Sequence, residues 1–139
     1  MAQQIRDVMT GAPVCVDPDT VVSDVALKMR DDDIGAVLVT DDDRLLGVVT
    51  DRDLVTRFLA GGGDPGTTTA RSVASSAEYT IAPDDGVNVA VQIMRDRAVR
   101  RLPVVEDGRP IGIVSIGDLA IERDQDSALA DISAARPNT

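Results

Sequence analysis

The sequence contains no histidine and no tryptophan, and among its 139 residues it has one cysteine, one phenylalanine and one tyrosine. Without histidine, Ser–His–Asp or Cys–His catalytic groups and His/Cys zinc sites are excluded as a class. The single cysteine, Cys15, cannot form a disulfide within the chain, which suits a reducing compartment. A disulfide between two copies stays open, but a small apolar residue on a buried strand is the interpretation that we favour.

Further absences concern membranes and nucleic acids. No apolar run reaches transmembrane length, and the N-terminus lacks the apolar core of a signal peptide, so we expect a cytoplasmic protein. The net charge is −10, from 24 acidic and 14 basic residues. Such a surface repels phosphodiester backbones and anionic lipids, and aromatic stacking platforms are missing. We therefore expect no nucleic-acid partner and no membrane partner.

An internal repeat dominates what is present. Residues 8–54 match residues 73–119 at a constant shift of 65 without a gap, and 15 of these 47 positions are identical. A match of this length indicates a duplication, and two copies at this period argue against a solenoid. Since neither half is large enough to be stable alone, we expect the two copies to fold as one body.

The hydrophobic pattern predicts the elements of each copy. In the first copy we expect a short turn at 5–9, a short strand at 14–16 and a helix over 21–32, whose start is capped within Pro18–Thr20. The apolar face of this helix is Val22, Val25, Ala26 and Met29, and that of its counterpart is Val87, Ala90, Val91 and Met94. Gly35 ends the first helix region, and strands follow at 36–39 and 45–49.

Turns and a further helix complete each copy. Asp41–Asp43 forms one hairpin turn, and Asp107-Gly108 is a strong hairpin signal in the second copy. A helix over residues 51–60 is expected to bury Leu54, Val55, Phe58 and Leu59. After Leu119 we expect helix to around Ala134, followed by a frayed tail.

These elements predict an α/β (α+β) fold of two pseudo-symmetric β-α-β-β-α repeats, packed sheet to sheet as one module. The expected boundaries are residues 5–60 for the first repeat and 61–69 for a Gly-rich linker. The second repeat then covers residues 70–121, and a C-terminal helical extension and tail covers residues 122–139.

The most specific motifs are GVVTDRD at 47–53, GIVSIGD at 112–118 and LPVV at 102–105. With the repeat, they resemble a tandem pair of cystathionine-β-synthase (CBS) domains, the regulatory unit called a Bateman module. The resemblance covers roughly residues 5–121, with Leu38 where the second copy has Pro103. It implies two clefts between the repeats that bind adenosine-containing ligands such as AMP, ADP, ATP or S-adenosylmethionine.

The resemblance also implies the residues of each cleft. In the first cleft Asp118 would hold the ribose, Val14 and Ile34 would sandwich the base, and Arg100 and Arg101 would contact phosphate. The full set for the first cleft is Thr10, Ala12, Val14, Ile34, Gly35, Arg100, Arg101, Ser115, Gly117 and Asp118. The set for the second cleft is Thr50, Arg52, Asp53, Ser75, Ala77, Tyr79 and Val99. Gly35-Ala36 replaces the two arginines there, so we expect the Asp118 cleft to be better equipped for a charged phosphate.

Physical chemistry supports a carboxylate at these helix starts, but it leaves an alternative open. A carboxylate accepts two hydrogen bonds from a ribose cis-diol, and the free N–H groups of a first helical turn favour a phosphate. However, Thr50-x-x-Asp53 and Ser115-x-x-Asp118 are also typical of helix capping boxes with a shorter acid. Arg100-Arg101 equally fits a solvated pair, and Asp41–Asp43 a solvated turn rather than a cation site.

Three functions follow from these patterns. The first is a non-catalytic sensor that binds an adenosyl ligand and acts in trans on an effector protein or on its own oligomer, a homodimer being expected. The alternative is a structural dimerisation module without ligand, joined through the helices at 22–30 and 54–59. An enzyme is disfavoured, because Asp53 and Asp118 would lie in separate clefts. We expect no catalytic residue, no metal site and no cofactor apart from the ligand.

Overall fold

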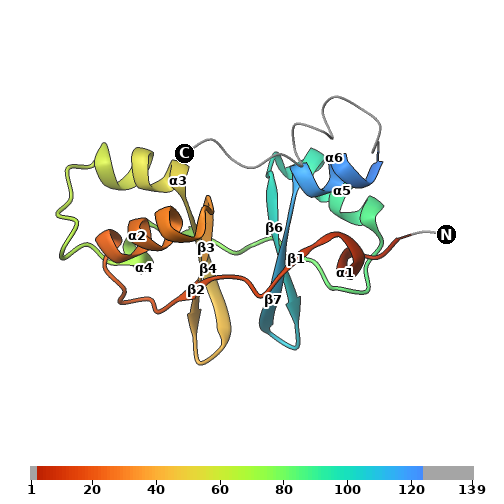
Figure 1. Cartoon of the computed structure of the whole chain (residues 1–139), viewed down its shortest axis with the longest axis horizontal. Helices are drawn as coiled ribbons and strands as arrows, with labels where there is room; N and C mark the ends of the chain where they lie inside the picture. Colours follow the sequence, from red (N-terminus) through yellow and green to blue (C-terminus); the bar gives the residue numbers. More distant parts are fainter. Residues whose placement is uncertain (1–2, 124–139) are drawn as a thin grey trace. The chain divides into compact units, whose positions relative to one another are not determined.

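The computed structural model describes residues 3–123, which fold into two compact units (Figure 1). Unit 1 comprises Met1–Ala12 and Tyr79–Thr139, of which 3–12 and 79–123 are described. Unit 2 is the continuous segment Pro13–Glu78. Each unit is an α/β body with its own sheet, so the predicted mixed fold with two sheets is confirmed.

Unit 2 contains a four-stranded sheet in the order β2-β3-β4-β5. Strand β2 runs parallel to β3, and the other pairs are antiparallel. The strands are β2 Cys15–Val16, β3 Ala36–Asp41, β4 Arg44–Thr50 and β5 Ser75–Ser76; the helices are α2 Val22–Asp32, α3 Asp51–Asp53, the π-helix η1 Leu54–Leu59 and α4 Ala70–Val73. Val25, Val37 and Val49 are fully buried where α2 packs on β3 and β4, which places the core on one face of the sheet.

Unit 1 repeats this plan with a three-stranded sheet in the order β1-β7-β6, whose neighbours are antiparallel. Its strands are β1 Thr10–Gly11, β6 Arg101–Glu106 and β7 Arg109–Ser115; its helices are α1 Ile5–Val8, α5 Val87–Arg97 and α6 Ile116–Arg123. Ile81 forms a parallel bridge to Val104 in the place that β2 takes in unit 2. The core joins Ile5 of α1, Ala90 of α5, Leu119 of α6 and the strand residues Leu102 and Val114.

The start of each sequence repeat lies in the unit formed mainly by the other repeat. In unit 1 the N–H of Ile5 donates to the carbonyl of Asp85 at 2.9 Å, and that of Arg6 donates to the carbonyl of Pro83 at 3.0 Å. In unit 2 the equivalent N–H of Ala70 donates to Thr20 at 2.7 Å, and that of Arg71 donates to Pro18 at 3.0 Å. The sequence repeats and the compact units therefore have different boundaries, which the repeat pattern alone did not predict.

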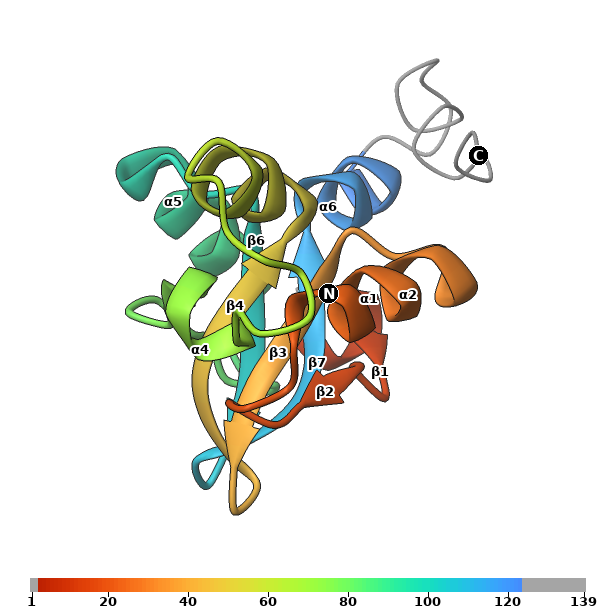
Figure 2. The same cartoon turned by 90° about the vertical axis from the view of Figure 1, so that its left-hand side faces the viewer.

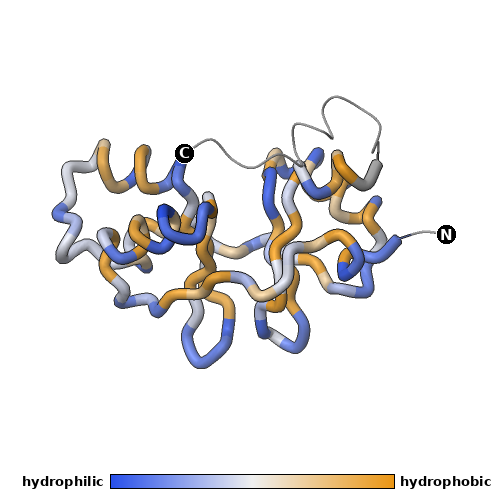
Figure 3. The backbone as a smooth tube through the Cα atoms, viewed as in Figure 1, coloured by the Kyte–Doolittle hydropathy of each residue, from blue (hydrophilic) through white to orange (hydrophobic). Residues whose placement is uncertain are grey.

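Both hairpins close through two residues in the left-handed region, as expected of type I′ turns. Their φ values are 51° and 64° at Asp42 and Asp43, and 54° and 81° at Asp107 and Gly108. Each turn is hydrophilic and lies at the end of its sheet away from the helix that follows the second strand (Figure 2, Figure 3). The hairpin predicted at Asp107-Gly108 is confirmed.

The predicted details of helix α2 need correction. No side chain caps its start, because the residue at the N-cap is Val21, which has no polar side chain. The backbone carbonyls of Pro18 and Thr20 accept from α4. The helix ends at Asp32 with Asp33 in the left-handed conformation (φ 53°), before Gly35 is reached. Ala26 is exposed, so the buried face is narrower than predicted.

The helix expected at 51–60 is present but is not buried as predicted. Its second part is a π-helix, and Val55 and Leu59 are 58% and 68% exposed, respectively. Leu54 and Phe58 are partly buried against the core of unit 2. The helix predicted to reach Ala134 is described as far as Arg123, and the rest lies outside the described residues. Between residues 3 and 123, no helix has the length and apolar character needed to cross a membrane.

Candidate functional site

The junction of β7 and α6 in unit 1 holds the first predicted carboxylate. The N–H of Asp118 donates to Oγ of Ser115 at 3.1 Å, and Oδ2 of Asp118 accepts from the N–H of Ser115 at 2.9 Å. These reciprocal bonds form a capping box that satisfies N–H groups left unpaired at a helix start. The sequence spacing alone predicted this arrangement as the alternative to ribose binding.

The junction of β4 and α3 in unit 2 has the same geometry. The N–H of Asp53 donates to Oγ1 of Thr50 at 3.1 Å, and Oδ2 of Asp53 accepts from the N–H of Thr50 at 2.9 Å. The cap therefore uses one carboxylate oxygen in each copy. Capping and ligand binding are compatible, because the second oxygen remains outside the box.

The second oxygen distinguishes the two copies. Oδ1 of Asp53 accepts from Oγ of Ser75 at 3.2 Å and lies 3.7 Å from Nε of Arg57. Among the side chains that the structure describes, no hydrogen bond or ion pair reaches Oδ1 of Asp118. The Asp118 carboxylate thus retains an acceptor at the positive end of an eight-residue helix.

Strand β6 brings basic residues next to the start of α6. The carbonyl of Arg100 accepts from the N–H of Ile116 at 2.9 Å, and Arg101 pairs with Ser115 across β6 and β7. Both arginine side chains are exposed. An exposed arginine beside a helix N-terminus suits the binding of a phosphate, so the pair fits the predicted contact as well as it fits a solvated pair.

Strand β1 pairs with β7 on the side opposite β6. Thr10 pairs with Ile113 and Gly11 with Gly112, and the chain then turns through Ala12, whose φ is 50°. The sequence placed Thr10 and Ala12 on the first repeat, but both belong to the same unit as Ser115 and Asp118.

The predicted ligand-binding residues are distributed over both units. Unit 1 holds Thr10, Ala12, Tyr79, Val99, Arg100, Arg101, Ser115, Gly117 and Asp118. Unit 2 holds Val14, Ile34, Gly35, Thr50, Arg52, Asp53, Ser75 and Ala77. The structure thus brings together the Ser115–Asp118 and Thr50–Asp53–Ser75 groups, each within one unit. That Val14, Ile34 and Gly35 complete the first set, and Tyr79 and Val99 the second, stays a prediction.

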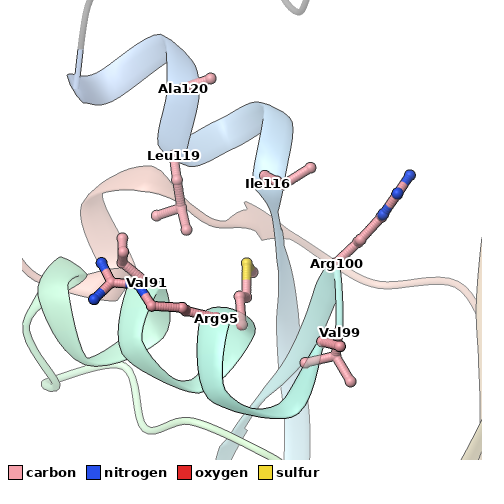
Figure 4. Close-up of a pocket in the computed structure, with 9 residues that line it drawn as sticks. Val91, Arg95, Val99, Arg100, Ile116, Leu119 and Ala120 are labelled. Atoms are coloured by element: carbon pink, nitrogen blue, oxygen red, sulfur yellow. The ribbon is translucent and has the colours of Figure 1, made fainter.

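A cavity of about 530 Å³ that the sequence did not predict lies in unit 1, between α5 and α6. Leu119 points from α6 toward α5, whereas the side chain of Arg100 extends away from both helices (Figure 4). The cavity borders the start of α6 through Ile116 but does not include Ser115 or Asp118. Its lining residues are Val91, Met94, Arg95, Ala98, Val99, Arg100, Ile116, Leu119 and Ala120. Two apolar helix faces in the sequence, around Val91 and Leu119, are the signal that could have found it.

Cys15 corrects another expectation, since its side chain on β2 is exposed rather than buried. Desolvation by the atoms packed around it still raises the pKa of the thiol, and the negative charge of Asp43 raises it further. A raised pKa keeps the thiol protonated and poorly nucleophilic at neutral pH. Among the side chains that the structure describes, no three of His, Cys, Asp or Glu are placed to hold a metal ion.

Comparison with known proteins adds a family to this geometry. The CBS domain family matches the chain twice, at residues 5–60 and 70–123. Hypoxic response protein 1 of Mycobacterium tuberculosis (strain ATCC 25618 / H37Rv) is 39% identical over 116 residues, which cover 83% of this chain and 81% of that protein.

Two solved structures share the fold. The crystal structure of Hypoxic Response Protein I with two coordinated zinc ions has a TM-score of 0.77 and 38% identity, covering 85% of this chain and 97% of that one. The CBS domain protein PAE2072 from Pyrobaculum aerophilum, complexed with AMP, has a TM-score of 0.79 and 27% identity. That likeness covers 96% of this chain and 100% of the other.

Proposed function

The chain belongs to the CBS domain family, and from this premise we propose that it is a non-catalytic regulatory module for an adenosine-containing ligand. The observation that carries the proposal is the Asp118 carboxylate, which caps α6 through Oδ2 and keeps Oδ1 available. The AMP complex of a related protein supports the class of ligand.

The ribose and the phosphate of such a ligand have matching groups in unit 1. A ribose cis-diol donates two hydrogen bonds, which a carboxylate accepts without reorganising the capping box. The N–H of Gly117 lies in the first turn of α6, where a helix favours an anion, and Arg100 and Arg101 add positive charge. The exposed arginines favour a nucleotide phosphate, while S-adenosylmethionine offers the same ribose to Asp118.

Occupancy would become a signal only if the ligand binds one state of the protein more tightly than another. We propose that the output acts in trans, on an effector protein or on the oligomer of this chain. With no histidine and a single cysteine, the chain cannot form a His/Cys zinc site of its own.

Calorimetry with AMP, ADP, ATP and S-adenosylmethionine tests the proposal, combined with thermal unfolding of the wild type and Asp118→Ala. We expect one ligand to bind below about 1 mM and to raise the melting temperature of the wild type, because binding to the native state stabilises it. Asp118→Ala should lose this stabilisation and about 1 kcal/mol of intrinsic stability, since it also loses the hydrogen bond from the N–H of Ser115, while Oγ of Ser115 still accepts from the N–H of residue 118. Asp118→Asn separates the two effects, because its side-chain oxygen still caps. If none of the four ligands binds in this range, the proposal is wrong.

A structural dimerisation module without ligand is the second candidate. Exposed apolar side chains on η1 favour it, Val55 at 58% and Leu59 at 68%, because a contiguous apolar surface is a common interface. Light scattering of the wild type and of Leu59→Asp measures this role, with loss of the dimer expected in the variant. A dimer that forms without ligand, together with no ligand binding, would favour this candidate.

A further inference from the structure

Among residues 3–121, Asp53 is the one charged residue that is buried, with 7% of its surface exposed. Its Oδ2 serves the capping box, and its Oδ1 is held by Ser75 at 3.2 Å with Nε of Arg57 at 3.7 Å. Nη1 of Arg57 also donates to the carbonyl of Ala74 at 3.2 Å, which fixes the guanidinium next to the segment that enters β5. Both oxygens of this carboxylate thus have partners from within unit 2.

Asp118, the equivalent residue in unit 1, has no such partners among the described side chains. Arg57 follows Asp53 by four residues, one turn along the helix, and the residue four positions after Asp118 is Glu122. Residues at this spacing share a helix face, so an arginine can reach the earlier carboxylate and a glutamate cannot neutralise it. Thr10 corresponds to Ser75, but no hydrogen bond from Thr10 to Asp118 occurs among the described side chains.

We propose that Arg57 makes the carboxylate of Asp53 less available to a ligand than the carboxylate of Asp118. Together with Ser75 it occupies Oδ1 of Asp53, where the ribose of an adenosine ligand would otherwise bind, so that the Asp118 site fills first. This inference rests on the proposed function and adds an order of binding to it.

The interaction of Arg57 with Asp53 is weak enough for a ligand to displace it. The side chain of Arg57 is 53% exposed, and an ion pair with an exposed partner contributes little to stability because solvent screens it. A ligand at higher concentration can therefore replace it, which gives the protein two thresholds for one ligand. Displacement would also break the bond from Arg57 to Ala74, so that filling of the second site would release a link between η1 and β5.

The first test needs no ligand. In NMR spectra of the full chain, the Nε–Hε signal of Arg57 should move in Asp53→Asn and stay in place in Asp118→Asn. Both variants keep an oxygen that can accept the capping bond, so folding is preserved. An Arg57 signal that is the same in Asp53→Asn as in the wild type would overturn the inference, whatever the protein binds.

The second test measures AMP binding by calorimetry in Asp118→Ala, where only the Asp53 site remains. Adding Arg57→Ala should tighten AMP binding about threefold, the scale of an exposed ion pair. Arg57→Lys should tighten it less, because a cation remains. In Asp53→Ala, which leaves the Asp118 site, Arg57→Ala should change nothing. Asp118→Asn replaces Asp118→Ala if circular dichroism shows that the latter is unfolded.

The outcomes separate this inference from the proposed function. Tighter AMP binding on removal of Arg57 supports the inference. Weaker or unchanged binding overturns it, since Arg57 would then be a ligand contact or a bystander, while AMP binding at Asp118 still supports the proposed function. If AMP fails to bind the wild type and every variant, AMP binding is refuted and the order of binding falls with it.

Discussion

At the scale of single residues, Gly47 and Gly112 explain why the copies share a glycine before the capping box. A Cβ at Gly47 would lie 2.7 Å from the carbonyl oxygen of Ser75, and one at Gly112 would lie 2.7 Å from the carbonyl oxygen of Thr10. Both glycines thus permit a neighbouring strand to approach closely, and in unit 2 this places Ser75 at the Asp53 carboxylate. Real Cβ atoms essentially never approach this closely, so any other residue must displace a strand.

We therefore predict that Gly112→Ala lowers the free energy of unfolding by about 1–3 kcal/mol, the usual cost of overpacking. Gly11, the partner of Gly112 across β1 and β7, provides the control, because a Cβ added there would meet no atom within 4 Å. Gly11→Ala should change stability by less than about 0.5 kcal/mol in urea unfolding. Equal losses in the two variants would refute the close-crossing explanation.

At the scale of elements, the two hairpins use different residues for the same backbone. Asp43 at φ 64° takes the position that Gly108 takes at φ 81°. The second central position of a type I′ turn strongly prefers glycine, because a Cβ is unfavourable in the left-handed region. The acidic turn in unit 2 is therefore the less favourable version of the glycine turn in unit 1.

Glycine at position 43 should therefore stabilise the first turn, and aspartate at position 108 should destabilise the second. We predict that Asp43→Gly stabilises the protein by about 0.5–1 kcal/mol and that Gly108→Asp destabilises it by a similar amount. Urea unfolding followed by circular dichroism measures both. A loss of stability in Asp43→Gly would show that the turn depends on the Asp43 side chain rather than on its backbone.

The elements themselves were largely predictable from the sequence, for physical reasons that the repeat makes visible. Apolar periodicity located α2, α5 and the four long strands, and the spacing from Ser115 to Asp118 predicted the capping box. Local pattern could not show the π-helix, whose Val55 and Leu59 are apolar but exposed. It also could not show that Asp53 is paired with Arg57 and Ser75, because Ser75 reaches it only through the pairing of β4 with β5.

At the scale of the whole molecule, the main finding is the exchange of the segments that begin each repeat. Helix α1 binds through carbonyls of Pro83 and Asp85, and α4 binds through those of Pro18 and Thr20. These contacts join residues far apart in the sequence, so periodicity contains no signal for them. The exchange places Thr10 beside β7 and Ser75 beside β4, where Ser75 donates to Asp53.

The placement of α1 in unit 1 and of α4 in unit 2 predicts which unit a core mutation destabilises. Ile5 is fully buried in unit 1, so Ile5→Ala should cost about 2–5 kcal/mol and should speed hydrogen exchange mainly in 79–123. Val73 lies in the core of unit 2, and Val73→Ala should speed exchange mainly in 13–59. Mass spectrometry of amide exchange measures both. Faster amide hydrogen exchange within 13–59 in Ile5→Ala, with 79–123 unaffected, would contradict the placement of α1 in unit 1.

The central claim is that Asp118 binds the ribose of an adenosine ligand and does so before Asp53. The most direct measurement is a titration of the ¹⁵N-labelled protein with AMP, followed through the backbone amides of 115–118 and 50–53. We predict saturable shifts at 115–118 at lower AMP concentrations than at 50–53. Shifts that begin at 50–53, or no shift at either helix start up to about 1 mM AMP, would contradict the claim.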